Sequence, residues 1–451
     1  MIKKGLKWLG LDRPVLYSLT LRIWNGLSQP VTLILLAAHL TSAEQGFYYS
    51  FSGIQALSVI AELGITFVIG QFAAHEHASM ILAGDANSAA YLQGKERLAS
   101  IFRLGVFWNV IVALVCIVIF VPGGLWFFSD NTTSTNIDWK MPWILFVVFS
   151  SLNVILSPVY AILNGIGYIG DTIMIQLLQT VVSTLALWLV LATNHRLYAV
   201  VISPAAGFVG GGAGVIVWHG KTLVGIWKKK TRDICVRYWK EIFPLQSKVA
   251  LSWLSGYVGF YFSTPVIFKT LSPEIAGQYG MTANILLAIS TSAAVWVNVR
   301  SPVFAHLAAG QKRSELRHVF MDAAAKSTII AAIGYGLLCL GQQVPYISTR
   351  FAFMHRLVEP KILLVFIAAY CLAHVYGLLN VYFRSFKVDP LFWVSMSAAF
   401  TTLMCLSRIT RGYGLMGTAC LGLVLNGVSL LIAVAYMRRE FRVMASNPKA
   451  V

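Results

Sequence analysis

The segment Leu40-Thr-Ser-Ala-Glu-Gln-Gly-Phe-Tyr48 returns 231 residues later as Leu271-Ser-Pro-Glu-Ile-Ala-Gly-Gln-Tyr279. At the same offset, Ala74-His75 matches Ala305-His306. Each copy follows one long apolar stretch and opens another, and 231 residues is about half of the 451-residue chain. A repeat of half-chain length in an apolar protein is typical of transporters built from two similar bundles. The repeat therefore predicts two related halves.

The composition is that of a polytopic membrane protein. Apolar residues make up 57% of the chain, charged residues make up 12%, and the mean hydropathy is +0.72. Soluble domains usually carry about 25% charged residues. Stretches long enough to cross a bilayer as helices lie at 15–39, 46–74, 104–128, 141–163, 172–192, 199–218, 248–269, 276–299, 326–345, 361–383, 389–407 and 413–436. We therefore predict an all-α fold of twelve transmembrane helices in two six-helix bundles around a central cavity.

The positive charges follow topology. With the N-terminus inside, 26 of the 35 Lys and Arg residues fall on internal segments, as the positive-inside rule requires. This asymmetry, and not a nucleic-acid partner, accounts for the net charge of +18. Six spans per half give both halves the same orientation, so the repeat is parallel. The predicted organisation is an N-terminal bundle at 1–218, a basic cytoplasmic linker at 219–247, a C-terminal bundle at 248–437 and a basic cytoplasmic tail at 438–451. We expect the first helix to be retained, because Arg13 and Arg22 interrupt it.

Polar residues form narrow stripes on four predicted helices, the first two of each half. At about 100° per residue, the members of each stripe share one helix face. The stripes are Ser18, Arg22, Asn25, Gln29 and Thr32; Gln55, Ser58, Glu62 and Thr66; Lys248, Ser252, Ser255 and Gly259; and Asn284, Thr291 and Asn298. Such faces either join helices to one another or line a hydrated cavity. Their occurrence on equivalent helices of both halves favours a shared cavity.

Three ionisable residues lie deep in predicted spans. Arg22 and Glu62 either neutralise one another, or Arg22 faces the cavity as an anion site with Glu62 as its charge partner or a coupling residue. His374 either responds to a proton gradient or is a neutral, hydrogen-bonded core residue. The six cysteines form no disulfide framework and no paired metal motif, and we expect no cofactor. Close helix packing is expected at Gly207, Gly210, Gly211 and Gly214.

The same segments resemble the Wzx-type O-antigen and polysaccharide flippases. The resemblance covers essentially the whole chain and is carried by the first repeat copy, continuing to Glu62-Leu-Gly64 and Gln71-Phe-Ala-Ala-His75. Further matching positions are Glu241-Ile-Phe-Pro-Leu-Gln246, Ala276-Gly-Gln-Tyr-Gly280 and Trp296. These flippases belong to the multidrug/oligosaccharidyl-lipid/polysaccharide exporter superfamily. The resemblance implies two six-helix bundles around a cavity lined by helices 1, 2, 7 and 8.

The resemblance also implies a function and a set of site residues. The expected activity is translocation of an undecaprenyl-pyrophosphate-linked oligosaccharide across the bacterial inner membrane, for O-antigen, capsule or exopolysaccharide synthesis, by a protein that is not an enzyme. Arg22 and Lys248 match the cationic cavity positions of such proteins. Membrane lipids, a polysaccharide polymerase and chain-length proteins are the implied partners. Asn25, Gln29, Asn284 and Asn298 are expected to bind the glycan, and Ser252 and Thr291 are further expected substrate-binding residues.

Two alternatives remain from the sequence. One is a multidrug or metabolite cation-coupled antiporter of the same superfamily, for which Glu62 is the clear intramembrane acid. The other is a membrane polysaccharide ligase or glycosyltransferase. Enzymes of that kind need catalytic acids or bases on a substantial loop, and the external loops predicted here are short.

Overall fold

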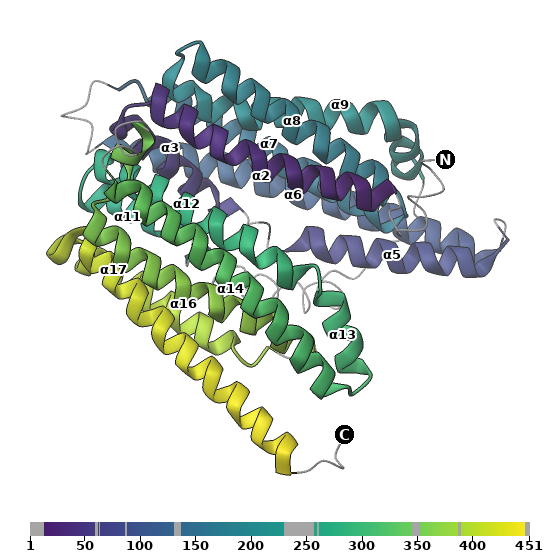
Figure 1. Cartoon of the computed structure of the whole chain (residues 1–451). Helices are drawn as coiled ribbons and strands as arrows, with labels where there is room; N and C mark the ends of the chain where they lie inside the picture. Colours follow the sequence, from purple (N-terminus) through teal and green to yellow (C-terminus); the bar gives the residue numbers. More distant parts are fainter. Residues whose placement is uncertain are drawn as a thin grey trace, which may run out of the picture. The chain divides into compact units, whose positions relative to one another are not determined.

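A computed structural model describes residues 13–58, 62, 64–85, 88–129, 137–229, 257–258, 261–344, 352–386 and 389–446. Within these ranges every regular element is a helix and none is a strand (Figure 1). The all-α fold expected from the sequence is confirmed.

Eight helical stretches of the described chain are long and apolar enough to cross a membrane. They correspond to nine of the twelve predicted spans, because α17 (Phe392–Ser446) includes most of 389–407 and all of 413–436. The two segments of α17 meet at Gly414, whose φ of 60° and ψ of −151° are not helical. Glycine tolerates this conformation because it has no Cβ. The protein is therefore a multi-pass membrane protein.

The other three predicted spans are not among these eight stretches, and two of them are described only in part. The span at 15–39 forms α2 (Arg13–His39). The span at 46–74 is not one continuous helix, because α3 (Ser42–Gln55) ends before α5 (Ile65–Ala83) begins. Gly64 directly precedes α5 with a left-handed φ of 67°, which interrupts a helix. The span at 248–269 is described at 257–258 and from 261, and it ends in α11 (Ser263–Thr270).

The chain divides into two compact units. The first comprises Met1–Leu40 and Phe51–Tyr257. Its core is formed by apolar side chains such as Ile69, Ile101 and Ile162, which are fully buried. Within it, α2 packs on α8, and α9 packs on α7 and α8 (Figure 1). Besides α2, α5 and the end of α3, it contains α6 (Ala89–Ser129), α7 (Lys140–Gly165), α8 (Ile169–Ala192), η1 (Arg196–Tyr198) and α9 (Ala199–Trp227).

The second unit comprises Thr41–Ser50 and Val258–Val451. The first turns of α3 therefore belong to this unit, and α3 enters the first unit at Phe51. An aromatic cluster lies at the core of the second unit, where the ring centroids of Phe320 and Tyr382 are 4.8 Å apart. Besides α11, α17 and the start of α3, it contains α12 (Pro273–Asn298), α13 (Ser301–Ala309), α14 (Arg313–Gln343), η3 (Ala352–Arg356) and α16 (Pro360–Arg384).

Each copy of the sequence repeat begins a helix. In the first copy, the Thr41 and Glu44 side chains cap α3 reciprocally. The Thr41 N–H donates to Glu44 Oε2 at 2.8 Å, and the Glu44 N–H donates to Thr41 Oγ1 at 3.2 Å. In the second copy, Ser272 Oγ accepts from the N–H of Ile275 at 3.3 Å and caps α12. These bonds satisfy amide groups that a helix leaves unpaired at its N-terminus.

The glycines of α9 pack closely on α8, as the sequence predicts. Gly210 approaches the backbone of Gln179, and a Cβ on Gly214 would lie 3.0 Å from Ile175. The helix also continues beyond the predicted end at residue 218 to Trp227. Arg103 of α6 accounts for this end, because its guanidinium donates to the carbonyl oxygens of Trp227 and Lys229.

Candidate functional site

Helix α2 presents one face to its own unit. The buried Ser28 lies on this face, and the Trp24 ring lies 6.1 Å from the ring of Trp188 in α8. Trp188 Nε1 donates to Thr32 Oγ1 at 2.9 Å, and Thr32 donates to the carbonyl oxygen of Ser28. Thr32, at one edge of the predicted polar stripe, therefore joins two helices.

The exposed surface of α2 divides into an apolar face and a polar face. At about 100° per residue, the exposed Leu16, Leu19, Ile23, Leu27, Val31 and Ile34 gather on one side of the helix. Ile23 and Leu27 are 60% and 68% exposed, which suits contact with lipid chains. Arg22, Asn25 and Gln29 are also exposed, but they lie between the apolar face and the face packed on α8. Intramembrane polar groups of this kind normally face protein or water.

Arg22 and Glu62 are not brought together as an ion pair. Across the described part of the first unit, Arg22 makes no salt bridge, whereas Glu62 is buried and accepts a hydrogen bond from the Thr66 hydroxyl. Ser58 and Gln55 are buried as well, and neither amide atom of Gln55 has a hydrogen-bond partner among the residues that the structure describes. This second predicted stripe thus lies in the interior of the protein, unlike the stripe on α2.

Helix α12 carries an exposed polar face in the second unit. Asn284, Thr291 and Asn298 recur at seven-residue intervals and are all exposed. The opposite side of α12 holds buried apolar residues such as Leu286 and Ala293. Asn284 Nδ2 donates to the carbonyl oxygen of Gly280 at 2.8 Å, which orients the amide while its oxygen stays able to accept a further bond. Lys248 and Ser252 lie outside the described residues.

His374 forms a hydrogen-bonded link between three helices of the second unit. Its Nδ1 lies 2.9 Å from Ser290 Oγ of α12, and its Nε2 lies 3.0 Å from Ser327 Oγ of α14. The Ser327 hydroxyl donates its one hydrogen to the carbonyl oxygen of Ala293, so it accepts from His374 Nε2–H. In the neutral imidazole, Nδ1 then accepts from Ser290. Both ring nitrogens therefore have a hydrogen-bond partner in this buried position.

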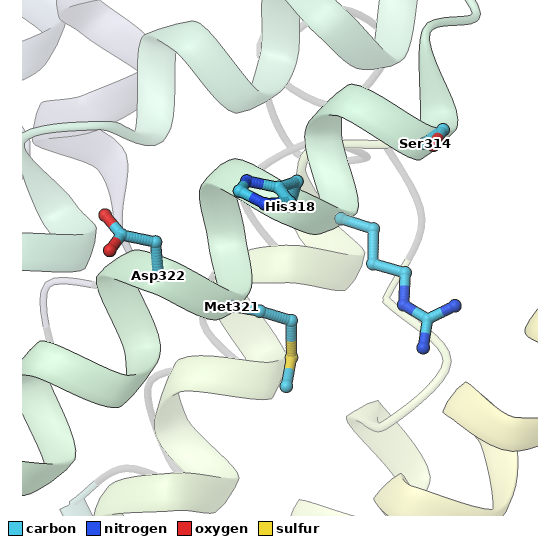
Figure 2. A pocket seen from close by; sticks show the side chains of 5 residues that line it. Ser314, His318, Met321 and Asp322 are labelled. Atoms are coloured by element: carbon cyan, nitrogen blue, oxygen red, sulfur yellow. The ribbon is translucent and has the colours of Figure 1, made fainter.

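A separate pocket of about 460 Å³ lies on α14. Figure 2 shows the side chains that line it extending from successive turns of this helix. Asp322, at one end, pairs with Arg300 at 2.8 Å and with Lys326 at 2.8 Å. None of the predicted site residues lines the pocket, whose described lining is Ser314, Arg317, His318, Met321 and Asp322.

The structure contains two further contacts that the sequence did not predict. Arg356 of η3 donates to Ser42 Oγ at 2.6 Å, at the first residue of α3. Gly46 and Gly277, which occupy equivalent repeat positions, both lie in a close contact between α3 and α12. The matching glycines of the two copies were the available signal for this contact, whereas nothing local marks Arg356.

Proteins of known structure share this fold. No family model and no curated protein matches the sequence. Several solved structures match. One is an inward-facing multidrug resistance MATE family transporter of the MOP superfamily, with a TM-score of 0.61 and 13% identity over 94% of this chain and 100% of that one. The lipid II flippase MurJ in an inward closed conformation matches with a TM-score of 0.61 and 10% identity, over 94% and 87%.

A third match is a MOP superfamily transporter from Pyrococcus furiosus, with a TM-score of 0.57 and 12% identity over 96% of this chain and 95% of that one. At these identities the likeness establishes the fold. The chain is thus an all-α membrane protein with the fold of the MOP superfamily. These neighbours are transporters and a flippase.

Proposed function

We propose that this chain is an alternating-access flippase that moves an undecaprenyl-pyrophosphate-linked oligosaccharide across the bacterial inner membrane for surface polysaccharide synthesis. The observation that carries the proposal is the surface of α2, where exposed Arg22, Asn25 and Gln29 are separated from an exposed apolar face. A lipid-linked substrate needs both environments, because its glycan and phosphates require polar partners while its polyprenyl chain requires lipid.

Arg22 is the proposed contact for the pyrophosphate. A guanidinium donates two parallel hydrogen bonds to a phosphate group and stays charged at all physiological pH values. Lys248 would add a second positive charge, and Ser252 and Thr291 would contribute hydroxyl groups. The amides of Asn25, Gln29, Asn284 and Asn298 would bind the glycan, since each offers a donor and an acceptor to sugar hydroxyls.

Glu62 and His374 are the proposed coupling residues. Both are buried, and both are ionisable groups placed among helices that a transport cycle would rearrange. The proposed organisation is two six-helix bundles at 1–218 and 248–437, with the linker 219–247, the tail 438–451 and both termini in the cytoplasm. Polysaccharide polymerase and chain-length proteins are the proposed partners.

The second candidate is a cation-coupled multidrug antiporter. It is favoured by the buried carboxylate of Glu62, which the Thr66 hydroxyl orients. A carboxylate in such a position can hold a proton or a cation during transport. The likeness to a MATE family transporter agrees with this candidate as well as with a flippase.

Replacing Arg22 tests the proposal in a strain whose surface polysaccharide depends on this gene. We expect Arg22→Ala to lower the rate of surface polymer formation roughly tenfold to a hundredfold, because a charge-assisted hydrogen bond to the substrate is lost. Lipid-linked precursor should accumulate in the inner leaflet. The rate of polymer formation in Arg22→Lys should lie between those of the unchanged protein and of Arg22→Ala, since lysine keeps the charge but not the paired donors.

The control is Lys361→Ala, which removes an exposed cation from the first turn of α16. Polymer formation should be unchanged in this variant. Normal surface polymer in Arg22→Ala, without build-up of precursor, would remove Arg22 from the mechanism. Normal polymer together with increased drug sensitivity in Glu62→Gln would favour the antiporter.

A further inference from the structure

The two copies of the sequence repeat contact each other in the second unit. A Cβ added to Gly46 of α3 would overlap the carbonyl oxygen of Pro273, at the start of α12. A Cβ added to Gly277 of α12 would overlap the carbonyl oxygen of Ser42, at the start of α3. The same hypothetical atom would lie 2.9 Å from the Gly46 nitrogen. The two helix backbones therefore touch at a point that only glycine permits.

This contact is reciprocal in the numbering of the repeat. Ser42 is equivalent to Pro273 and Gly46 to Gly277, since each pair is separated by the repeat distance of 231 residues. Gly46 thus packs against the first residue of α12, and Gly277 packs against the first residue of α3. The exchange is what a local two-fold axis between the copies produces. We call this contact between α3 and α12, at Ser42, Gly46, Pro273 and Gly277, the glycine crossing.

The glycine crossing combines close packing with unpaired polar groups. Next to it on α3, the Tyr49 side chain packs against Gly280, and Ser50 is 0% exposed. Neither the Tyr49 hydroxyl nor the Ser50 hydroxyl has a hydrogen-bond partner among the described residues. Packing stabilises the contact, but buried unpaired hydroxyls oppose it because they would be hydrated if the helices separated.

Opposed contributions of this kind suit a contact that opens and closes. We propose that the glycine crossing is a gate: it is closed where the first turns of α3 and α12 touch, and it parts during transport. Arg356 holds the closed state through its hydrogen bond to Ser42. Because α3 continues into the first unit at Phe51, parting frees a helix that both units share. The gating role rests on the proposed transport function.

Thiol labelling of a buried reporter measures the closure directly. In protein reconstituted into lipid vesicles, Ser50→Cys places an isosteric thiol next to the crossing, and all native cysteines except Cys116 are changed to serine. We expect Gly46→Ala and Gly277→Ala each to raise labelling of the reporter by a membrane-impermeant maleimide about tenfold, because the added Cβ holds the helices apart. The double variant should label little faster than either single one, since both disrupt one contact.

Two matched controls separate opening from unfolding. Gly336→Ala makes the same chemical change in α14, where an added Cβ meets nothing within 4 Å, and it should leave reporter labelling unchanged. Cys116 is 1% exposed in α6 and should stay unlabelled in every variant. Arg356→Gln weakens the closed state without adding an atom to the crossing, and it should raise reporter labelling several-fold.

The gate proposal would be contradicted if the reporter were labelled equally in Gly46→Ala, Gly277→Ala, Arg356→Gln and the control Gly336→Ala. Labelling of Cys116 in parallel with the reporter would overturn it as well, because the crossing would then act in general stability. None of these measurements needs a transported substrate. Failure of the flippase proposal in the Arg22 experiment is therefore distinguishable from failure of the gate.

Discussion

At the scale of single residues, His374 has a hydrogen-bond partner at each ring nitrogen. Its two ring nitrogens bond Ser290 and Ser327, which come from different helices. We expect His374→Leu to lower the free energy of unfolding by about 2 kcal/mol, because the partly buried Ser290 hydroxyl loses its acceptor. Thermal unfolding in detergent measures the effect.

A suitable control for His374→Leu is Ser397→Ala. The Ser397 hydroxyl donates only to the carbonyl oxygen of Val394 in its own helix, and the residue is exposed. Its removal should change stability by less than about 0.5 kcal/mol. Equal unfolding temperatures for the two variants would mean that the imidazole contributes nothing as a link between helices.

At the scale of helices, α9 offers two adjacent glycines with opposite surroundings. A Cβ on Gly211 would lie 2.9 Å from Gln179 Oε1 and would overlap the Tyr160 hydroxyl, which donates to that same oxygen. Gly212 has nothing within 4 Å of an added Cβ. We expect Gly211→Ala to destabilise the protein by about 1–3 kcal/mol through overpacking. Gly212→Ala should be neutral or stabilising by up to about 1 kcal/mol.

Gly211→Ala and Gly212→Ala make the same chemical change in the same helix, so they differ only in what surrounds the added methyl group. Unfolding of both proteins in one detergent gives the difference directly. If Gly212→Ala were the more damaging change, the packing of α9 on α8 would not be what stabilises this pair of helices.

At the scale of the whole molecule, the proposed transport function requires that the polar faces of α2 and α12 contact water. Cysteines at Asn25 and Asn284 should react with a water-soluble maleimide in membrane vesicles that the reagent can enter. A cysteine at Leu27 should react at least about tenfold more slowly despite its exposure, because it would face lipid, where a thiol is not ionised. Reaction rates that are equal at Asn25 and Leu27 would remove the distinction between the two faces of α2.

The sequence by itself determined the features that depend on local pattern. Hydropathy and charge predicted a multi-pass helical membrane protein, and the small-residue spacing around Gly211 predicted the packing of α9. The repeat from Leu40 to Tyr48 and from Leu271 to Tyr279 marked two helix starts, because an N-cap is a local property of a few residues. Periodicity of 3.6 residues also identified the exposed polar faces of α2 and α12.

Only the tertiary structure decided which residues meet across long distances in the chain. The same periodicity predicted one polar stripe from Gln55 through Glu62 to Thr66, but Gly64 interrupts the helix before Thr66, and the Gln55 and Glu62 side chains are buried. His374 finds its serines 84 and 47 residues away. In the sequence, Gly46 and Gly277 are only equivalent positions of a repeat. The packing of α3 on α12 brings them into one contact. A local pattern fixes the face of a helix on which a residue lies, whereas the packing of helices fixes what that face touches.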